Sequence, residues 1–196
     1  SAEGKISMGR LKKGDLDTEG WTNLATLQGR IDSAPLFIDD SPNMTLMEIR
    51  AKCRRLKQRN DLKLVVLDYL QLMSSGKKVE SRQQEVSEFS RSLKLLAKEL
   101  DVPVIALSQL NRGSEQRTDK RPMVSDLRES GSIEQDADMV ILLHREDMYN
   151  PDSDRVGEAD MIIAKHRGGP TRTIPLAFSG KYSRFNNMAN EAPPQY

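Results

Sequence analysis

Six short apolar segments, each about the length of a β-strand, are spread along the chain and alternate with stretches of helical pattern. Several are apolar at successive positions, which is typical of strands covered on both faces. This order of strands and helices favours a parallel or mixed sheet flanked by helices, which is the α/β class. The segments are residues 35–39 (PLFID), 64–68 (LVVLD), 102–108 (VPVIALS), 139–143 (MVILL), 159–164 (ADMIIA) and 173–178 (TIPLAF).

Two segments between these strands carry a clear helical signal. Thr45 and Glu48 have the spacing of a capping box, and apolar residues follow at helical intervals until Asn60. Ser81 and Gln84 repeat that spacing at the start of a longer segment. Its apolar positions would form one stripe along a helix, made of Val86, Phe89, Leu93, Leu96, Ala97 and Leu100.

Charge and cysteine content exclude several classes of protein. The 196 residues hold 30 Lys and Arg against 29 Asp and Glu, so any contact with nucleic acid must be local and cannot rest on bulk positive charge. The single cysteine, Cys53, cannot form an internal disulfide, which fits a reducing, cytoplasmic setting. No apolar run approaches the roughly 20 residues of a membrane helix, so no membrane partner is expected.

Polar side chains follow three of the predicted strands. Asp68 ends LKLVVLD, Gln109 follows VIALS, and the cations Lys165 and Arg167 follow ADMIIA. Ligands of open α/β sheets bind at the carboxyl ends of strands, so these residues are the first candidates for a site. An acid, an amide and a cation pair at one sheet edge would suit a polyphosphate bound with Mg²⁺.

Each candidate also has a structural explanation. An aspartate at a strand end often caps the next turn, as expected for Asp39 before Ser41, and Gln109 could be an ordinary surface amide. The segment 165–170 (KHRGGP) could be a solvated basic turn between two strands. The co-occurrence of all three at strand ends favours the functional interpretation.

Residues 125–138 (SDLRESGSIEQDAD) combine charge, small residues and a glycine, and lead directly into a predicted strand. Backbone amides in such a segment can bind a phosphate without a basic side chain. A helix-capping loop without a ligand explains the pattern equally well. Two polar connections, 112–126 and 145–157, are long enough to be functional or mobile, and residues 189–196 are expected to be a disordered tail.

Four longer runs resemble a known family. LVVLDYLQLM, SRSLKLLAKELDVPVIALSQLNR, DKRPMVSDLRESGSIEQDADMVILLHR and IIAKHRGGPTRTIPLAFSGKYSRF are similar to the motor domain of bacterial replicative DNA helicases of the DnaB type, and the similarity extends over residues 1–188. It implies a RecA-like fold and a homo-hexameric ring on single-stranded DNA that unwinds the duplex at the replication fork by ATP hydrolysis. It also implies ATP and Mg²⁺ as cofactors, and primase and a helicase loader as partners.

The resemblance assigns roles to the strand-end residues. In LVVLDYLQL, Asp68 matches the Walker B aspartate that holds Mg²⁺, and in LSQLNR, Gln109 matches the glutamine that senses the γ-phosphate. In IIAKHRGGP, Lys165 and Arg167 match the basic pair that reaches the nucleotide of the neighbouring subunit, with Arg167 as the arginine finger. In DLRESGSIEQ, the positions that match the DNA-gripping loop of the central channel are Arg128, Glu129 and Gly131.

One family motif has no match. Nothing in the chain fits the phosphate-loop pattern GxxxxGK[ST], which the family places, with its catalytic glutamate, before the segment that SAEGK resembles. We therefore expect a RecA-like, mostly parallel twisted sheet flanked by helices and truncated at its N-terminal side, which is inactive on its own. The alternatives are a related RecA-family ATPase and a module that joins a ring without hydrolysing ATP.

Overall fold

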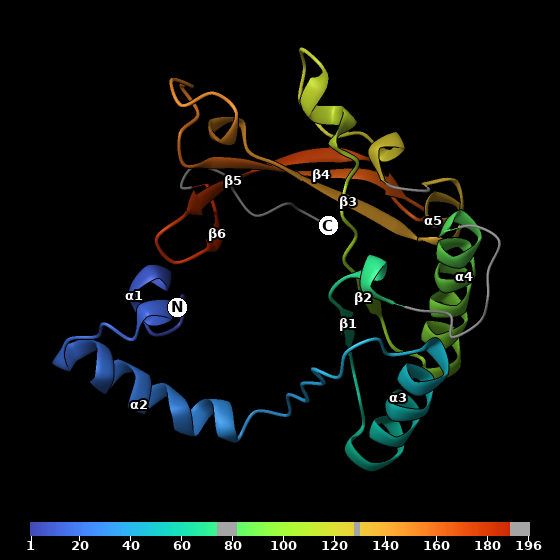
Figure 1. Ribbon diagram of the computed structural model, residues 1–196, viewed down its shortest axis with the longest axis horizontal. Coiled ribbons are helices and arrows are strands. Elements are labelled where there is room, and N and C mark those ends of the chain that lie inside the picture. The colour runs from blue at the N-terminus through green and yellow to red at the C-terminus, as the bar shows by residue number, and fades with distance from the viewer. Residues whose placement is uncertain (74–81, 128–129, 189–196) are drawn as a thin grey trace. The chain divides into compact units, whose positions relative to one another are not determined.

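The computed structural model describes residues 1–73, 82–127 and 130–188. Figure 1 shows the elements in chain order. They are α1 (Met8–Lys13), α2 (Thr18–Asp32), α3 (Leu46–Asn60), β1 (Val65–Leu67), η1 (Leu70–Leu72), α4 (Arg82–Leu100), β2 (Val104–Ala106), η2 (Arg112–Gln116), η3 (Val124–Asp126), α5 (Ser130–Asp136), β3 (Met139–His144), η4 (Glu146–Met148), β4 (Glu158–His166), β5 (Arg172–Ser179) and β6 (Arg184–Asn187), where η marks a 3₁₀ helix.

The chain divides into two compact units. The first unit consists of Ser1–Ile38, Leu143–Ile162 and Thr173–Tyr196, and the second unit consists of Asp39–Leu142 and Ile163–Arg172. All the strand-end candidates belong to the second unit. No helix in the described ranges is both long enough and apolar enough to cross a bilayer.

The described strands form two sheets. β1 and β2 pair in parallel, with Val66 opposite Ile105, and the second sheet has the order β3-β4-β5-β6. Within it, β5 and β6 are antiparallel and are joined by a tight turn, in which the Tyr182 amide donates to the Ser179 carbonyl at 3.2 Å. Helices and sheets in this order confirm the predicted α/β class, with parallel and antiparallel pairing both present.

Helix α4 supplies the core of the second unit. Its predicted apolar stripe is buried, and Phe89 and Val86 have 0% and 1% of their surface exposed. Leu93, Leu96 and Leu100 continue the buried stripe along the same face. Complete burial of a side chain as large as phenylalanine contributes strongly to the apolar stabilisation of the unit.

Helix α3 begins as its sequence predicts. The Thr45 hydroxyl accepts a hydrogen bond from the Glu48 amide at 3.3 Å, and the Glu48 carboxylate accepts one from the Thr45 amide at 2.8 Å, which completes the capping box. The helix ends at Asn60 because Asp61 takes the left-handed conformation, with φ of 49°. The cap predicted at Ser81 lies outside the described residues.

Helices α3 and α4 pack against each other through both apolar and charged contacts. Ile49 and Cys53 of α3 are buried, and burial raises the pKa of the Cys53 thiol. At the surface, Glu99 of α4 accepts hydrogen bonds from Arg50 and Arg54 of α3. These shared contacts hold α3 beside the helix that forms the core.

One predicted strand is absent, and one observed strand was not predicted. Residues 35–39 form no strand, and Leu36 and Ile38 are exposed. An apolar run becomes a strand only when another strand pairs with it, and periodicity does not report pairing. The turn that follows is as predicted, since the Asp39 carboxylate accepts a hydrogen bond from the Ser41 amide at 3.1 Å. Strand β6 was not predicted, because its sequence, RFNN, is mostly polar.

In the first unit, ion pairs order the long connection at residues 145–157. The Arg155 guanidinium donates to both carboxylate oxygens of the buried Asp160, at 3.1 and 2.7 Å, and to Glu158 at 2.9 Å. Arg145 lies over the ring of Phe178, with 3.9 Å from its guanidinium carbon to the ring centroid. The connection is therefore part of the packed unit.

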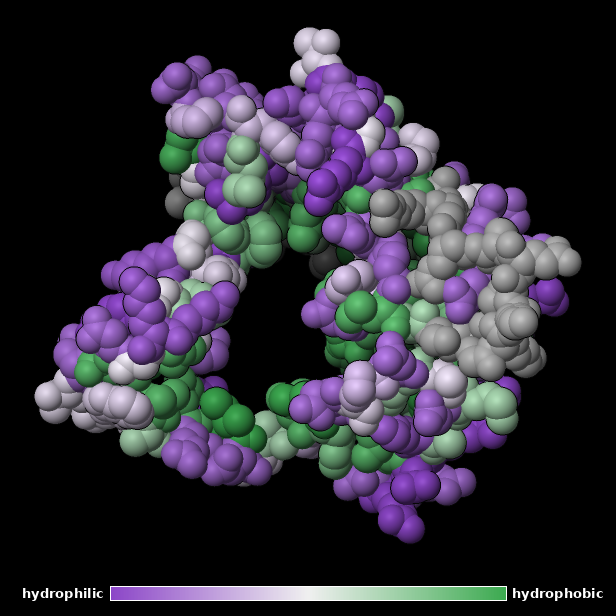
Figure 2. All heavy atoms as spheres, in the orientation of Figure 1, coloured by the Kyte–Doolittle hydropathy of each residue, from purple (hydrophilic) through white to green (hydrophobic). Residues whose placement is uncertain are grey.

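One face of the second unit's strands stays apolar and exposed. The cross-strand partners Val66 and Ile105 have 56% and 50% of their surface exposed, and Met139 and Ile141 of β3 are also exposed. Figure 2 shows hydrophobic side chains at the surface over β1 and β2. The described residues therefore cover only one face of these strands, whereas the sequence predicted cover on both.

Candidate functional site

Asp68 and Gln109 lie at the same edge of the parallel pair β1–β2. The pairing continues past the strands, because the Leu107 amide donates to the Leu67 carbonyl and the Leu70 amide donates to the Leu107 carbonyl, each at 2.9 Å. Asp68 follows Leu67 directly and is exposed. The register of two short strands thus puts the predicted acid and the predicted amide at one edge.

The side chain of Gln71 holds the segment that carries Gln109. Its Nε2 donates to the Ser108 hydroxyl at 3.0 Å and to the Gln109 carbonyl at 3.3 Å, and its Oε1 accepts from the Gln109 amide at 3.2 Å. Both backbone groups of Gln109 are therefore fixed by one amide. Gln71 was not predicted, and its position three residues after Asp68 in the run LDYLQL was the available signal.

Asp68 suits a magnesium ion that also binds phosphate. Within the described ranges its carboxylate makes no ion pair. No group of three or more His, Cys, Asp or Glu capable of holding a metal occurs among the described residues. Mg²⁺ in phosphate sites keeps several waters and needs only one or two carboxylates, and a single exposed aspartate fits that requirement.

Lys165 and Arg167 contact the last turn of α5. The Lys165 Nζ donates to the Glu134 carbonyl and, at 3.3 Å, to the Gln135 carbonyl. The Arg167 guanidinium donates to the Gln135 carbonyl at 3.5 Å and lies 3.4 Å from the Asp138 carboxylate. Both cations are thus fixed to the segment that joins α5 to β3.

This placement differs from the expected single sheet edge. Lys165 belongs to β4 and Arg167 follows it, so both lie on the four-stranded sheet, while Asp68 and Gln109 follow β1 and β2. The sequence marks each residue as following a strand but does not say which strands pair. Polar residues can therefore follow strands of two different sheets and give the same sequence pattern.

Asp138, two residues after the end of α5, contacts both α4 and the turn that follows β4. Its carboxylate pairs with Lys94 of α4 and with Arg167, and its backbone carbonyl accepts from the Arg167 amide at 2.8 Å. The hydrogen bond from Lys94, then the charges of Lys94, Arg167 and Lys165, lower the pKa of Asp138 against the opposing effect of desolvation. Asp138 is therefore held as a carboxylate between two cations.

The turn after β4 brings Gly169 close to the ring of His166. A Cβ on Gly169 would lie 2.9 Å from the ring of His166, closer than real side chains approach. The ring of His166 fills that space, and the chain passes directly beside it. A larger residue at position 169 would therefore require the side chain of His166 to move.

Of the three predicted DNA contacts, Arg128 and Glu129 lie outside the described residues. Gly131 is the second residue of α5, and a Cβ at this position would meet no atom within 4 Å. Its neighbour Ser132 accepts a hydrogen bond from the Ser87 hydroxyl of α4 at 2.9 Å, and its carbonyl accepts one from Ser90 at 3.4 Å. Gly131 is thus open on its outer side and anchored through the next residue.

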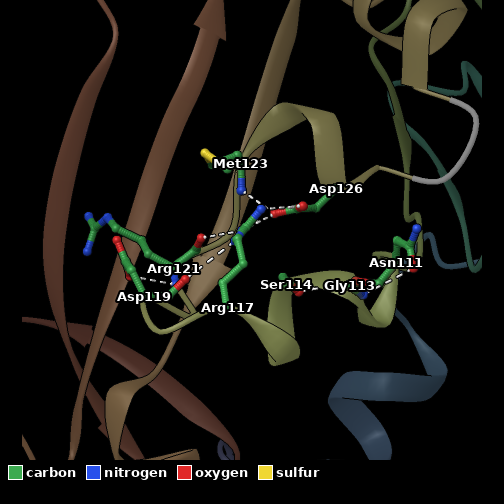
Figure 3. Close-up of polar contacts among 8 residues, drawn as sticks. All are labelled: Asn111, Gly113, Ser114, Arg117, Asp119, Arg121, Met123 and Asp126. Atoms are coloured by element: carbon green, nitrogen blue, oxygen red, sulfur yellow. Dashed lines mark hydrogen bonds and ion pairs between the residues drawn. The ribbon is translucent and has the colours of Figure 1, made fainter.

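An arginine–aspartate pair organises the connection between β2 and α5 (Figure 3). Arg117 donates to both carboxylate oxygens of Asp126, at 2.9 and 2.6 Å, and to the Arg121 carbonyl at 2.9 Å. The Met123 amide also donates to Asp126 at 2.8 Å, and the Asn111 amide donates to the Asp126 carbonyl at 2.6 Å. The buried Asp126 therefore holds together the two ends of the segment that runs from Asn111 to Asp126.

Comparison with known proteins identifies the relatives of the chain. The profile of the DnaB-like helicase C terminal domain matches residues 1–187. The chain is 70% identical to the "Replicative DNA helicase DnaB" of Leifsonia xyli subsp. xyli over 189 residues, and 56% identical to that of Geobacillus stearothermophilus over 188 residues. These alignments cover 96% and 95% of the chain and 41% of each relative, so the chain spans less than half of these curated relatives.

Two solved structures have a similar fold. One, described as an "ATPase Domain", superposes with a TM-score of 0.90 at 43% identity, covering 95% of this chain and 67% of that one. A "DnaB-Like Replicative Helicase", whose structure concerns "Its Interactions With Primase", superposes with a TM-score of 0.89 at 43% identity, covering 95% of this chain and 46% of that one. The fold described above is thus the fold of a DnaB-like ATPase domain.

Proposed function

Because the chain belongs to the DnaB-like helicase C-terminal domain family, we propose that it forms residues 1–188 of the motor of a hexameric replicative DNA helicase. Such a motor couples ATP hydrolysis to movement on single-stranded DNA and unwinds duplex at the replication fork. The observation that carries the proposal is the juxtaposition of Asp68 and Gln109 at one edge of β1–β2, in a chain that matches the family over residues 1–187. The related RecA-family ATPase and the non-hydrolysing module are not favoured, since the curated relatives above are named replicative helicases.

In this proposal, each strand-end residue has a role toward a nucleotide. Asp68 holds the Mg²⁺ that, when bound, neutralises charge on the phosphates of ATP. Gln109 donates its side-chain amide toward the terminal phosphate, from a backbone that Gln71 fixes at both its N–H and its C=O. Lys165 and Arg167 act on the nucleotide of a neighbouring subunit, where Arg167 stabilises charge that develops on the transferred phosphoryl group.

DNA binding is proposed for residues 128–131, from Arg128 and Glu129 to Gly131. The open space around Gly131 supports close approach by a phosphate, and the near-neutral charge of the chain requires DNA contacts to be local. Backbone and arginine contacts to phosphate carry no base information, so binding would be sequence-tolerant. Primase and a helicase loader are the proposed protein partners, and the cytoplasm is the proposed location.

The test uses a full-length enzyme, here named the reconstituted helicase. In it, residues 1–187 of this chain replace the matching segment of the Leifsonia xyli relative, to which the chain is 70% identical. Arg167→Ala should lower ATP hydrolysis by roughly 10³-fold while nucleotide binding persists. Asp68→Asn should lower hydrolysis as well, through loss of the metal.

Mixing these two variants tests action across a subunit boundary. A ring that contains both kinds of subunit has sites where Asp68 of one subunit meets Arg167 of the next, and those sites are complete. Hydrolysis should therefore recover in mixtures allowed to exchange subunits. Mixtures that stay as inactive as either variant, under conditions where labelled subunits do exchange, would refute the shared site.

A further inference from the structure

Lys165 and Arg167 make several hydrogen bonds and one ion pair with α5 and the residues that follow it. Lys165 donates to two carbonyls of the last turn of α5, and Arg167 reaches Gln135 and Asp138. The Arg167 amide is also bonded to the Asp138 carbonyl at 2.8 Å, so backbone and guanidinium meet the same residue. Asp138 therefore binds Arg167 through both its carboxylate and its backbone carbonyl, whereas Lys165 contacts only the carbonyls of Glu134 and Gln135.

We propose that Asp138 is a positioning residue for Arg167: it orients the guanidinium toward the neighbouring subunit's nucleotide while leaving most of it free. This inference rests on the proposed function, because it assumes that Arg167 acts on ATP. No substrate contact is assigned to Asp138 itself. Its carboxylate acts only through Arg167.

The geometry fits orientation rather than sequestration. The Arg167–Asp138 contact is 3.4 Å long, and 59% of each side chain is exposed, so the guanidinium keeps donors available to a phosphate. A sequestered arginine would instead be held by a close bidentate pair, as Arg117 is held by Asp126. The Arg167 guanidinium is therefore oriented by Asp138 and still has hydrogen-bond donors available to a phosphate.

Asp138 can aim Arg167 because it is itself fixed by Lys94. Lys94 projects from α4, the helix that forms the core, and its ammonium is the nearer of the two cations. The same helix holds α5 through the hydrogen bond between Ser87 and Ser132. The carboxylate therefore has a partner on α4 in addition to Arg167.

This arrangement links the cation pair to Gly131. The carbonyls that hold Lys165 and Arg167 belong to the last turn of α5, and Gly131 lies in the first turn of the same short helix. A shift of α5 when DNA contacts Gly131 would move Asp138 and Arg167 together. Asp138 should consequently contribute to the stimulation of hydrolysis by DNA.

The experiment compares Asp138→Asn, Asp138→Glu and the parent in the reconstituted helicase. Asp138→Asn keeps the shape but removes the charge, and should lower kcat for ATP by about ten- to a hundredfold with KM within about twofold. Stimulation by single-stranded DNA should fall in the same variant. Asp138→Glu retains the carboxylate and should recover at least about half of the lost kcat.

A second arm separates positioning from structural support. In the Arg167→Ala background, Asp138→Asn should cause no further loss, because the group that it orients is gone. Asp136→Asn is the matched control, since Asp136 ends α5 and makes no ion pair in the described ranges, and it should leave kcat unchanged. If Asp138→Asn does not fold, Lys94→Met removes the support of Asp138 and should lower kcat in the same direction.

The outcomes distinguish the inference from the proposed function. Unchanged kcat in Asp138→Asn, with Arg167→Ala inactive, overturns the inference and leaves the function intact. Equal losses from Asp138→Asn in the parent and in the Arg167→Ala background also overturn it, because they indicate a structural role. Hydrolysis that survives Arg167→Ala defeats the proposed function, and the inference with it.

Discussion

Arg117 and Asp126 form a two-pronged ion pair, with one guanidinium nitrogen on each carboxylate oxygen, at 2.9 and 2.6 Å (Figure 3). Only 8% of the Asp126 side chain is exposed, against 32% for Arg117, so the carboxylate is the buried partner. The connection from β2 to α5 has only short 3₁₀ helices among its described residues. This ion pair and the bridge between Leu110 and Leu127 hold the two ends of the connection together.

Loss of the Asp126 charge should destabilise the second unit. Asp126→Asn keeps the size of the side chain but leaves Arg117 without a counter-charge and removes an acceptor for the Met123 amide. The melting temperature of the polypeptide should fall by several degrees. Asp40→Asn, at an exposed carboxylate, provides the control and should leave the melting temperature unchanged; equal melting temperatures for all three proteins would contradict the prediction.

The same variant should change how stability depends on pH. The hydrogen bond from Arg117 lowers the pKa of Asp126 below its ordinary value of 3.8. Because the pKa of Asp126 is lower in the folded state, the unfolded chain binds the proton more readily. The stabilisation is therefore complete at pH values above the pKa of the unfolded state. It is lost as the pH falls through the pKa of the folded state. Urea unfolding from about pH 6 down to about pH 3 should show a smaller acid loss for Asp126→Asn than for the parent.

A charge at Gly131 should separate DNA binding from folding. A Cβ at this position meets no described atom within 4 Å, so Gly131→Asp adds negative charge where the DNA strand is proposed to pass, without a clash against the described residues. In the reconstituted helicase it should eliminate unwinding and DNA-stimulated hydrolysis while basal hydrolysis and ring assembly persist. Gly131→Ala adds bulk without charge and is the control. Unimpaired DNA binding by Gly131→Asp across a salt titration would show that this segment does not grip DNA.

Removal of the Gln71 amide should slow hydrolysis without weakening the fold. Gln71→Leu keeps the apolar stem but loses the three hydrogen bonds to Ser108 and Gln109. The Gln109 backbone would then lose both of its hydrogen bonds to Gln71, and kcat of the reconstituted helicase should fall about tenfold. Gln71→Glu retains one acceptor for the Gln109 amide and should lie between the parent and Gln71→Leu. A kcat equal to that of the parent in Gln71→Leu would exclude this role.

The 196-residue polypeptide by itself should not hydrolyse ATP. It contains no GxxxxGK[ST] segment, whose backbone amides and lysine would hold the β- and γ-phosphates. Asp68 alone offers weak affinity for Mg²⁺. Phosphate release should match that of an Asp68→Asn control, and turnover above this control would overturn the prediction.

The sequence predicted the elements that depend on local rules. The capping box of Thr45 and Glu48 and the buried stripe through Phe89 follow from spacing alone, and both are confirmed. Elements that depend on a distant partner were not predictable in this way. The run around Leu36 has the composition of a strand but no pairing, while the polar RFNN becomes β6 because a tight turn returns it to β5.

The same division applies to the candidate site. Strand-end position predicted the neighbourhood of Asp68 and Gln109, because parallel register brings carboxyl ends together. It did not predict that Lys165 and Arg167 would contact α5, since that depends on which sheet β4 joins. No individual role was predicted for Gln71 or Asp138, because neither follows the end of an apolar strand, and Asp138 entered only as the last residue of the segment 125–138. Their roles follow from contacts between segments far apart in the sequence.

The exposed partners Val66 and Ile105 have a consequence for mutational tolerance. Both remain about half in contact with water after folding, so polar replacements at these positions should cost this polypeptide little stability. Any severe effect of the same replacements in a longer protein would then report on what covers the strands there. A mutational scan of the 196-residue polypeptide should find that Val66 and Ile105 accept many substitutions. The same scan of a full-length helicase would show whether residues beyond this polypeptide contact the two side chains.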